Sequence, residues 1–457
     1  MLFIFLTLFI GRKIISKKYN SFKYFIMYRI LILLLIIIPF TSLFGQNLKT
    51  TNIRTKGNYY SEQQAYVNKK TTFYIKEDFE FKAIAIKART DDFKGAYVII
   101  NKDTIYFSIN DDYPSKDGYL YSELVFSSIL INEFKLFSGN IDGQIVIYLI
   151  NGTPDQSTKT KIAQEKHIIK SNKDQQAFCM EPGSIDQSVW RAGLTPPDYE
   201  HSFTEVRHCI IHHAAGSNTE TDYTAVVRSY YILHTETNGW SDIGYNYLIA
   251  QDGTIYKGRD PGTGEQDNVR GAHFCGKNSN TMGICLLGNY MDVEPPEAAL
   301  NALNNLLSWK LNKDGLDPFG TSFHVDRDLG TISGHRNGCS TSCPGDYVYN
   351  RLGEIKQQVT DSMANCVTGF EIISNKTEQI LIYPNPTNGN NINLNINSNF
   401  GLKEISVFDI RGQFIINKLI NNKNKKINID TESLRNGVYL IKLRGKNSVL
   451  TRKLIIR

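Results

Sequence analysis

Hydrophobic and polar residues alternate through residues 47–173 with the period of two that is typical of half-buried β-strands. The clearest runs are TTFYIKEDFEFKAIAIKA, GAYVIINKDTIYFSI and GQIVIYLIN. Turn-forming residues separate the runs at Asp111-Asp112, Pro114-Ser115 and Gly139-Asn140. The pattern predicts an N-terminal β-rich domain built as a small sandwich, with a polar bridge of TPDQSTKTKIAQEK and KSNKDQQ behind it. This domain holds no cysteine, and its sequence indicates no role.

Residues 177–367 have a mixed pattern that predicts an α/β domain. We expect buried strands at HCIIHHAA and MGICLLGNY, a hairpin in NYLIAQDGTIYKGRD turning at Asp252-Gly253, and an amphipathic helix at EAALNALNNLLSWKLNK. Pro295-Pro296 marks the start of that helix. All seven cysteines and eight of the nine histidines lie in this stretch, so we expect the functional site of the protein in this domain.

Short strands return in residues 379–457, at ISVFDIRGQFI, KKINIDTESL, GVYLIKLR and VLTRKLIIR. They predict a second small β-sandwich, and residues 368–378, which include SNKTEQ, are the expected linker. The fold class is therefore multidomain: a central α/β domain, with a mixed β-sheet and flanking helices, between two all-β sandwich-like domains.

Residues 1–46 are expected to be a leader with a signal peptide. An unbroken run of isoleucine and leucine at Ile30–Ile38 follows Arg29 and precedes Pro39. The run is too short to span a bilayer comfortably, which leaves an uncleaved anchor as the alternative. The apolar and basic segment before Met27 has no cleavage pattern, so we expect translation to begin at Met27.

The net charge of +6 does not indicate nucleic-acid binding. Six basic residues and no acidic ones lie in the leader, and removing them leaves 51 − 6 = 45 basic residues against 45 acidic ones. Because the body of the chain is neutral, no field of one sign remains to gather polyanions, and no nucleic acid is expected as a partner.

Two histidines and one cysteine form a candidate zinc-ligand set. SGHRNGCSTSCPG places His335 eight residues before Cys343, and His212 ends an apolar run. Two imidazoles and a thiolate leave a fourth position for a water that zinc can activate. Spacing alone leaves His213 as an alternative to His212, and Cys343 as an alternative disulfide partner in an exported chain.

Five blocks in order resemble the zinc-dependent N-acetylmuramoyl-L-alanine amidases, a family that includes peptidoglycan recognition proteins. They cover nearly all of residues 178–366: SVWRAG, CIIHHAAG, GWSDIGYNYLIAQDGTIYKGRD, VRGAHFCGKNSNTMGICLLGNY and ISGHRNGCSTSCPG. The resemblance implies that residues 177–367 are a zinc amidase or peptidoglycan recognition domain. It also implies that His212, His335 and Cys343 bind Zn²⁺.

The resemblance assigns roles to three further residues. Tyr245 in DIGYNY and Thr341 fall on catalytic positions, and His273 in GAH falls on a position that lines the substrate groove. The Tyr245 and Thr341 hydroxyls would stabilise the oxyanion or place the water. A sister branch of the family has a glutamate where this chain has Cys285, so a glutamate general base is not assumed.

An odd number of cysteines leaves at least one outside any disulfide, which fits a thiolate ligand at Cys343. We expect Cys285, on an apolar strand, to be a buried thiol. Cys275 and Cys339 flank the ligand-bearing loops, and Cys179 and Cys366 lie near the two ends of the domain. Both pairs are candidate disulfides, although sequence does not determine connectivity.

The C-terminal domain resembles the sorting domain of cargo for the type IX secretion system of Bacteroidetes. ILIYPNPTNG, ISVFDIRGQ, LRNGVYLIKL and TRKLIIR carry the resemblance over residues 379–457. It implies passage through the outer membrane by the secretion machinery, followed by release or attachment to the cell surface. Without the resemblance, a β-sandwich with no catalytic cluster would suggest a carbohydrate-binding module.

Together, these expectations predict a secreted zinc amidase that cleaves the amide bond between N-acetylmuramic acid and L-alanine in peptidoglycan. Its expected partners are peptidoglycan and muropeptides. Two alternatives stay open: a peptidoglycan-binding surface protein without catalysis, and an adhesin whose β-domains matter most. Family members that only bind typically lose the cysteine ligand, so Cys343 favours the enzyme.

Overall fold

The computed structural model describes residues 46–111, 118–173, 179–262, 265–364, 366, 381–388, 391–395, 402–409, 413–420, 426–445 and 449–457. The expected signal peptide, the start at Met27 and the linker 368–378 lie outside these residues. Within the described part of the chain, no helix has both the length and the apolar character needed to cross a membrane.

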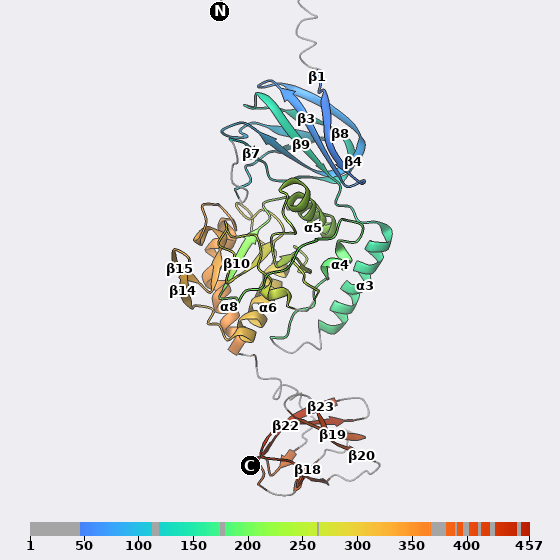
Figure 1. Cartoon of the computed structure of the whole chain (residues 1–457), viewed down its shortest axis with the longest axis vertical. Helices are drawn as coiled ribbons and strands as arrows, with labels where there is room; N and C mark the ends of the chain where they lie inside the picture. Colours follow the sequence, from blue (N-terminus) through green and yellow to red (C-terminus); the bar gives the residue numbers. More distant parts are fainter. Residues whose placement is uncertain are drawn as a thin grey trace, which may run out of the picture.

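The N-terminal domain is a nine-stranded sheet among the described residues, antiparallel except where β1 meets β4 (Figure 1). The path runs β2-β3-β9-β4-β8-β5-β6. Alternate residues of the strands form a buried cluster that includes Phe81, Ile86, Val98 and Leu149. The expected β-rich character is present, and the sandwich arrangement stays a prediction. The strands are β1 (Gln46–Asn47), β2 (Thr50–Lys56), β3 (Tyr60–Val67), β4 (Thr72–Ala88), β5 (Tyr97–Ile100), β6 (Asp103–Tyr106), β7 (Leu120–Tyr121), β8 (Val125–Phe137) and β9 (Gly143–Ile150).

The expected polar bridge is wrong in one respect, because most of it forms helix α3 (Gln156–Lys173). Its sequence is rich in good helix formers such as lysine, glutamine, alanine and glutamate. Asp155 stabilises the first turn by accepting a hydrogen bond from the Thr158 amide at 2.7 Å. The buried Ile162 anchors the helix in the core. Polarity alone therefore did not distinguish an exposed helix from a loop.

The central domain contains a five-stranded mixed sheet in the order β12-β11-β13-β10-β16. Four strands are parallel and β12 is antiparallel at the edge. One face packs on α5 and the other on α6 and α8. The strands are β10 (His208–His213), β11 (Tyr247–Ile249), β12 (Ile255–Lys257), β13 (Thr281–Leu286) and β16 (Ile332–Gly334), beside a separate pair, β14 (Thr321–His324) and β15 (Arg327–Gly330). The helical segments are α4 (Gln187–Trp190), α5 (Tyr223–Ile232), η1 (Leu233–Thr237), η2 (Gln266–Asn268), α6 (Glu297–Asp314), η3 (His335–Asn337), α7 (Asp346–Asn350) and α8 (Leu352–Ala364).

The elements predicted for this domain are confirmed. The two expected buried strands are β10 and β13, and the hairpin is β11 with β12. The amphipathic helix is α6, which starts directly after Pro296, ends at Asp314 and is capped by Gly315. Gly315 has a φ of 67°, the left-handed conformation that commonly ends a helix.

The described residues of the C-terminal domain form two sheets whose inward residues share one buried cluster, including Leu394, Ile429, Val407 and Ile441. All four strand runs expected from the sequence contain strands. The first sheet is β17 (Leu381–Tyr383), β18 (Asn391–Asn395) and β21 (Lys426–Asp430), and the second is β20 (Phe414–Leu419), β19 (Glu404–Asp409), β22 (Gly437–Arg444) and β23 (Val449–Ile456).

The two candidate disulfides are both formed. Cys179 is bonded to Cys366, and Cys275 to Cys339. The first joins the ends of the central domain, and the second joins the loop after His273 to the loop after His335. Cys209, Cys285 and Cys343 lie outside both bridges and are buried.

Candidate metal centre

The register of the central sheet places His212 beside His335. Strands β10 and β16 are parallel, and Ile211 is paired with Gly334. His212 follows Ile211 and His335 follows Gly334, and the centres of the two imidazole rings are 4.4 Å apart. Both side chains are buried.

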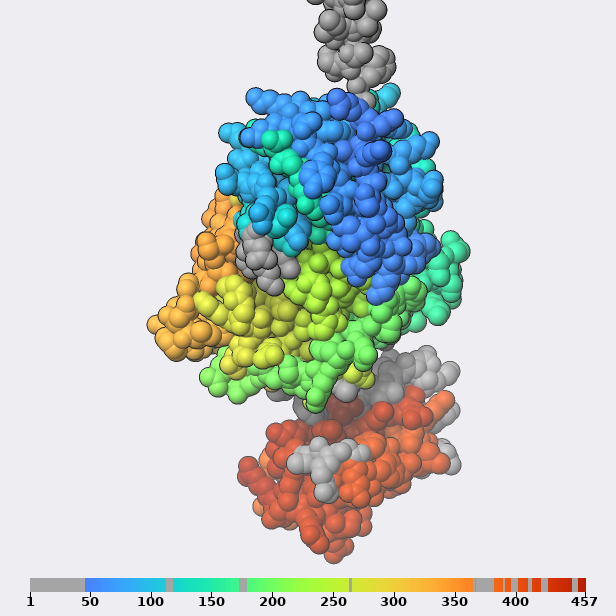
Figure 2. All heavy atoms as spheres, turned by 45° about the horizontal axis from the view of Figure 1, so that its top comes forward, coloured from blue at the N-terminus to red at the C-terminus, as the bar shows by residue number. Residues whose placement is uncertain are grey.

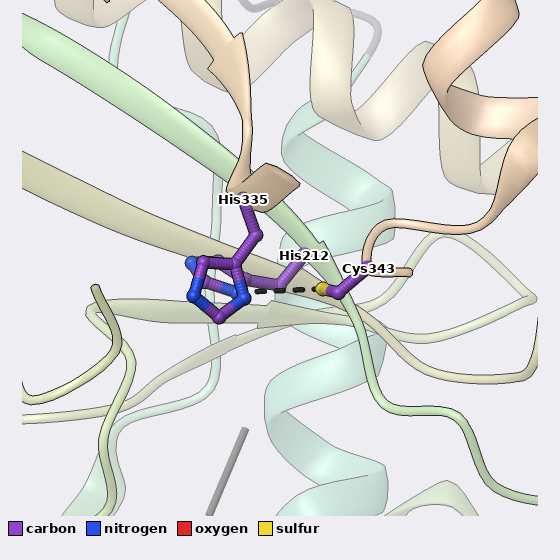
Figure 3. A group of neighbouring side chains, drawn as sticks. All are labelled: His212, His335 and Cys343. Atoms are coloured by element: carbon purple, nitrogen blue, oxygen red, sulfur yellow. Dashed lines mark hydrogen bonds between the residues drawn. The ribbon is translucent and has the colours of Figure 1, made fainter. Parts of the chain in front are cut away.

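Cys343 completes this group from the loop that follows η3 (Figure 3). Its Sγ lies 3.6 Å from Nδ1 of His212, and one ligand atom of each of His212, His335 and Cys343 lies within 4.8 Å of the others. The Arg336 amide donates to the Cys343 carbonyl at 3.0 Å, which closes the loop back onto η3. Residues far apart in sequence thus present two imidazoles and one thiol to one point.

His213 lies on the opposite face of β10 from His212, because successive side chains of a strand alternate. Its Nδ1 accepts a hydrogen bond from the Tyr290 amide at 3.1 Å. Its own amide lies 3.4 Å from the Cys343 sulfur, to which it donates. Of the two histidines that the spacing left interchangeable, the structure therefore groups His212 with Cys343 and His335. Cys343, the other open alternative, is not in a disulfide.

His273 packs directly behind His212. The distance between Nε2 of His212 and Nδ1 of His273 is 3.0 Å. Its ring lies against Gly283, where an added Cβ would come within 2.5 Å of the ring, so the close approach requires glycine. Because Nε2 of His212 is occupied in this way, Nδ1 is the atom left to face Cys343.

Burial and neighbouring histidines favour uncharged imidazoles here. Burial is the main cause that lowers the pKa of His212 well below its ordinary value, and His335 and His273 add to it. Burial also lowers the pKa of His273 to about 3, with smaller contributions from His335 and Arg259. Neutral imidazole is the form that binds a metal ion.

Tyr245 is buried next to this group, two residues before β11 begins. Its ring centre is 5.1 Å from that of His212 and 6.4 Å from that of His273. The candidate catalytic tyrosine and the candidate groove histidine are therefore both brought to the metal group.

Thr341 lies in the same loop as Cys343 and contacts its backbone. The Thr341 hydroxyl accepts a hydrogen bond from the Cys343 amide at 3.0 Å. Thr341 thus orders the loop that carries Cys343.

The donor set fits zinc by its chemistry and by its spacing. Bonds of about 2.3 Å to sulfur and 2.05 Å to nitrogen, at a tetrahedral angle, put the two ligand atoms roughly 3.6 Å apart. The separation of His212 Nδ1 and Cys343 Sγ is 3.6 Å. A second group in the described part of the chain, Cys275 with His335 and Cys339, has its two sulfurs engaged in a disulfide.

A polar pocket of about 350 Å³ lies beside the His273 loop. Its lining includes Arg259, Arg270, Gly271, Ala272 and Asn278. Asn278 connects the pocket to the metal group, because its Oδ1 accepts from the His273 amide at 2.7 Å. The pocket is therefore linked to the buried donor cluster through Asn278 and His273.

Two contacts near the site were not predicted from the sequence. The carboxylate of Asp111, in the N-terminal domain, accepts hydrogen bonds from the amide and hydroxyl of Ser342. Asp242, buried three residues before Tyr245, accepts from the Ile243 amide at 2.7 Å and from Gln187 at 2.9 Å. Asp111 is 231 residues from Ser342, and no sequence pattern connects them. Asp242 lies in the DIGYNY motif, but that motif identified only Tyr245 as a candidate functional residue.

Two family models match the chain. The N-acetylmuramoyl-L-alanine amidase family matches residues 202–346, and the secretion system C-terminal sorting domain matches residues 381–457. The first match spans the metal group, from before β10 to just after Cys343. The second spans the C-terminal strands.

Similar proteins cover the central domain. Peptidoglycan-recognition protein SC2 of Drosophila simulans is 33% identical over 170 residues, which are 37% of this chain and 83% of the relative. Peptidoglycan recognition protein 1 of Bos taurus is 35% identical over 147 residues, or 32% of this chain and 69% of the relative. Among solved structures, Drosophila PGRP-LB is 31% identical, with 37% of this chain and 91% of that chain covered and a TM-score of 0.30.

A relative at 33% identity is matched over most of its length, and the family model covers the strands and loops that carry the metal group. The chain therefore belongs to the family of N-acetylmuramoyl-L-alanine amidases and peptidoglycan recognition proteins, and it carries a C-terminal secretion sorting domain.

Proposed function

We propose that the protein is a secreted zinc-dependent amidase that hydrolyses the amide between N-acetylmuramic acid and L-alanine in peptidoglycan. The observation that carries the proposal is the buried group of His212, His335 and Cys343. A three-residue set of two imidazoles and a thiolate leaves a coordination position for water, as catalytic zinc sites do. A zinc ion bound there would supply a water that ionises near neutral pH and would polarise the scissile carbonyl.

Each of the remaining residues has a task in this proposal. His273 holds the His212 ring so that Nδ1 points towards Cys343. The hydroxyls of Tyr245 and Thr341 stabilise the oxyanion or place the water. Cys285, the register partner of His212 on β13, occupies the position of the glutamate in the sister branch. The proton for the departing amine therefore does not come from a carboxylate at this position.

His273 and the polar pocket beside it support binding of a glycopeptide. The pocket lining is mostly polar, which suits the hydroxyl, amide and carboxylate groups of a muropeptide. In this proposal the pocket holds the part of the substrate beyond the scissile bond, and His273 is joined to it through Asn278.

The proposal extends to the organisation and the location of the protein. A signal peptide within residues 1–46 directs export, and the β-sandwich of residues 379–457 directs passage by the type IX machinery to the medium or the outer surface. Residues 47–173 and 177–367 are then the β-sandwich domain and the amidase domain of the mature protein. Deleting residues 379–457 and locating the protein tests this; unchanged export contradicts it.

The test of activity uses purified protein and defined muropeptides. Free stem peptide should appear with the metal-loaded protein, disappear after treatment with a chelator, and return when zinc is added. Binding of the muropeptide without cleavage, in metal-loaded protein, would instead support a recognition protein. That second function is favoured by the relatives, whose names describe peptidoglycan recognition.

A further inference from the structure

Helix α5 is enclosed between the N-terminal and central domains (Figure 1). Nine of its ten residues are buried, including polar ones such as Thr224 and Ser229. One hydrophobic cluster, here called the interdomain cluster, includes Tyr60, Phe126 and Tyr148 of the N-terminal sheet together with residues of α5 and the central sheet. Figure 2 shows the N-terminal domain seated directly on the central domain. The two domains therefore share a core.

The segment that connects the two domains is packed closely against helix α5 at Gly152. The Gly152 carbonyl accepts a hydrogen bond from Nε of Arg228 on α5 at 2.8 Å. An added Cβ at Gly152 would come within 2.2 Å of the Ala225 carbonyl oxygen, so only glycine fits between the sheet and the helix. A linker between independently moving domains has no such requirement.

Two contacts join the N-terminal domain to the segment that follows His212 and His213. Lys82 of β4 forms an ion pair with Glu220 at 3.2 Å, and both side chains are largely buried. Phe126 of β8 packs on the Tyr230 ring with centres 6.0 Å apart. The Tyr230 hydroxyl in turn donates to the Ala214 carbonyl at 2.6 Å, two residues after His212.

A third contact joins the N-terminal domain to the Cys343 loop. Oδ2 of Asp111 accepts from the Ser342 hydroxyl at 3.1 Å and from the Ser342 amide at 3.3 Å. The Ser342 carbonyl accepts from the Gly345 amide at 3.0 Å and from the Arg336 guanidinium. Ser342 is thus held from both domains, directly between Thr341 and Cys343.

We propose that the N-terminal β-domain is a positioning element of the metal centre, which holds the segment after His212 through Lys82 and Phe126 and the Cys343 loop through Asp111. This assigns a role in cis to residues 47–173. The part that concerns the metal rests on the proposed zinc function, whereas the ordering of the two segments does not. Asp111 acts through Ser342 and touches no ligand, so it is a positioning residue.

The test compares Asp111→Asn with Asp103→Asn in the full chain. Asp103 is an exposed carboxylate of β6 in the same domain, so the control makes the same chemical change away from the interface. The first readout is amide hydrogen exchange, by mass spectrometry, of peptides that contain Ser342. The second is zinc affinity, from competition with a chromogenic chelator.

Asp111→Asn should speed exchange at the Ser342 peptide about tenfold and weaken zinc binding by about tenfold, the lower end of effects seen for groups that orient ligands. Asp103→Asn should change neither. Ser342→Ala removes the hydroxyl contact but keeps the amide contact, so it should reproduce part of the Asp111→Asn effect. The two effects should be less than additive in the double variant, because they share the hydroxyl contact. Equal exchange and equal zinc affinity in Asp111→Asn and Asp103→Asn would overturn the proposal.

The second arm uses Lys82→Met, with Lys102→Met, an exposed lysine between β5 and β6, as its control. Lys82→Met should speed exchange in peptides spanning residues 214–222 and leave the C-terminal domain unchanged. An unchanged peptide at 214–222 counts against the role of the interface. Neither readout needs turnover: if muropeptides are not cleaved while the Asp111 and Lys82 effects appear, the proposed function fails and this inference stands.

Discussion

Nδ1 of His212 lies 3.6 Å from Sγ of Cys343, although 131 residues separate the two in sequence. The distance is that between two ligands of one tetrahedral zinc ion. Strand β10 supplies the first and the loop after η3 supplies the second, so folding of the central sheet assembles the pair. The predictions below address this group and the residues that hold it.

Replacement of Cys343 tests the thiolate ligand. Cys343→Ser should lower zinc affinity by more than about a hundredfold and abolish muropeptide cleavage, because a neutral hydroxyl replaces a charged, soft ligand. Zinc content by mass spectrometry and release of stem peptide measure the two effects. Cys209→Ser, at a buried cysteine outside the site, should retain its zinc. Full activity of Cys343→Ser would falsify the zinc assignment.

Removal of one hydroxyl tests Tyr245. Tyr245→Phe should lower kcat by about 10²–10³-fold, the usual cost of losing an oxyanion donor, while zinc content and KM change little. Steady-state kinetics with a defined muropeptide provide both constants. Tyr66→Phe, at an exposed tyrosine of the N-terminal domain, is the matched control and should behave like the parent. A change confined to KM would indicate a binding role instead.

His273 is expected to act through His212. His273→Ala should weaken zinc binding by about 10–100-fold, since the contact at Nε2 of His212 that orients the ring is lost. The competition assay with a chelator measures this. His201→Ala, at a histidine outside the metal group, provides the comparison. If His273→Ala retains parental zinc affinity and loses only muropeptide affinity, His273 contacts the substrate and does not position the ligand.

Asp242 should make stability depend on pH. Burial raises the pKa of Asp242 to about 6 in the folded protein, partly opposed by Arg259. Below about pH 4 both the folded and the unfolded chain hold this proton. Between about pH 4 and 6 only the folded chain retains it, so stability is lost as the pH rises, by roughly 3 kcal/mol in total.

The comparison for Asp242 is with Asp242→Asn, which does not titrate. The free energy of unfolding of the parent, relative to the variant, should fall between about pH 4 and 6 and stay level above that range. Chemical denaturation at a series of pH values measures it, with Asp103→Asn as the control for an exposed carboxyl. A difference that is independent of pH would show that Asp242 titrates near its ordinary value.

Local patterns predicted most of the elements around the site. The apolar run before His212, the Asp252-Gly253 turn and the spacing of leucines in α6 each carry their signal within a few residues. Helix α3 was not predicted, because its residues are mostly polar and show little hydrophobic periodicity. In such a segment, only helix propensity and capping residues distinguish a helix from a loop. The family resemblance further indicated which residues of the motifs to follow.

Spacing left His212 and His213 interchangeable, and the family resemblance implied His212. The pleat of β10 supplies the physical basis for this choice, because it turns His212 towards Cys343 and the His213 ring towards Tyr290.

The sequence by itself determined the candidate ligands, the order of the domains and the odd number of cysteines, because these depend on residue type and spacing along the chain. Only the tertiary structure decided that His212 and His335 are neighbours, and that Asp111 and Lys82 reach the loops around them. The physical reason is that strand register and domain packing bring together groups that are up to 231 residues apart, and no local pattern encodes such a contact.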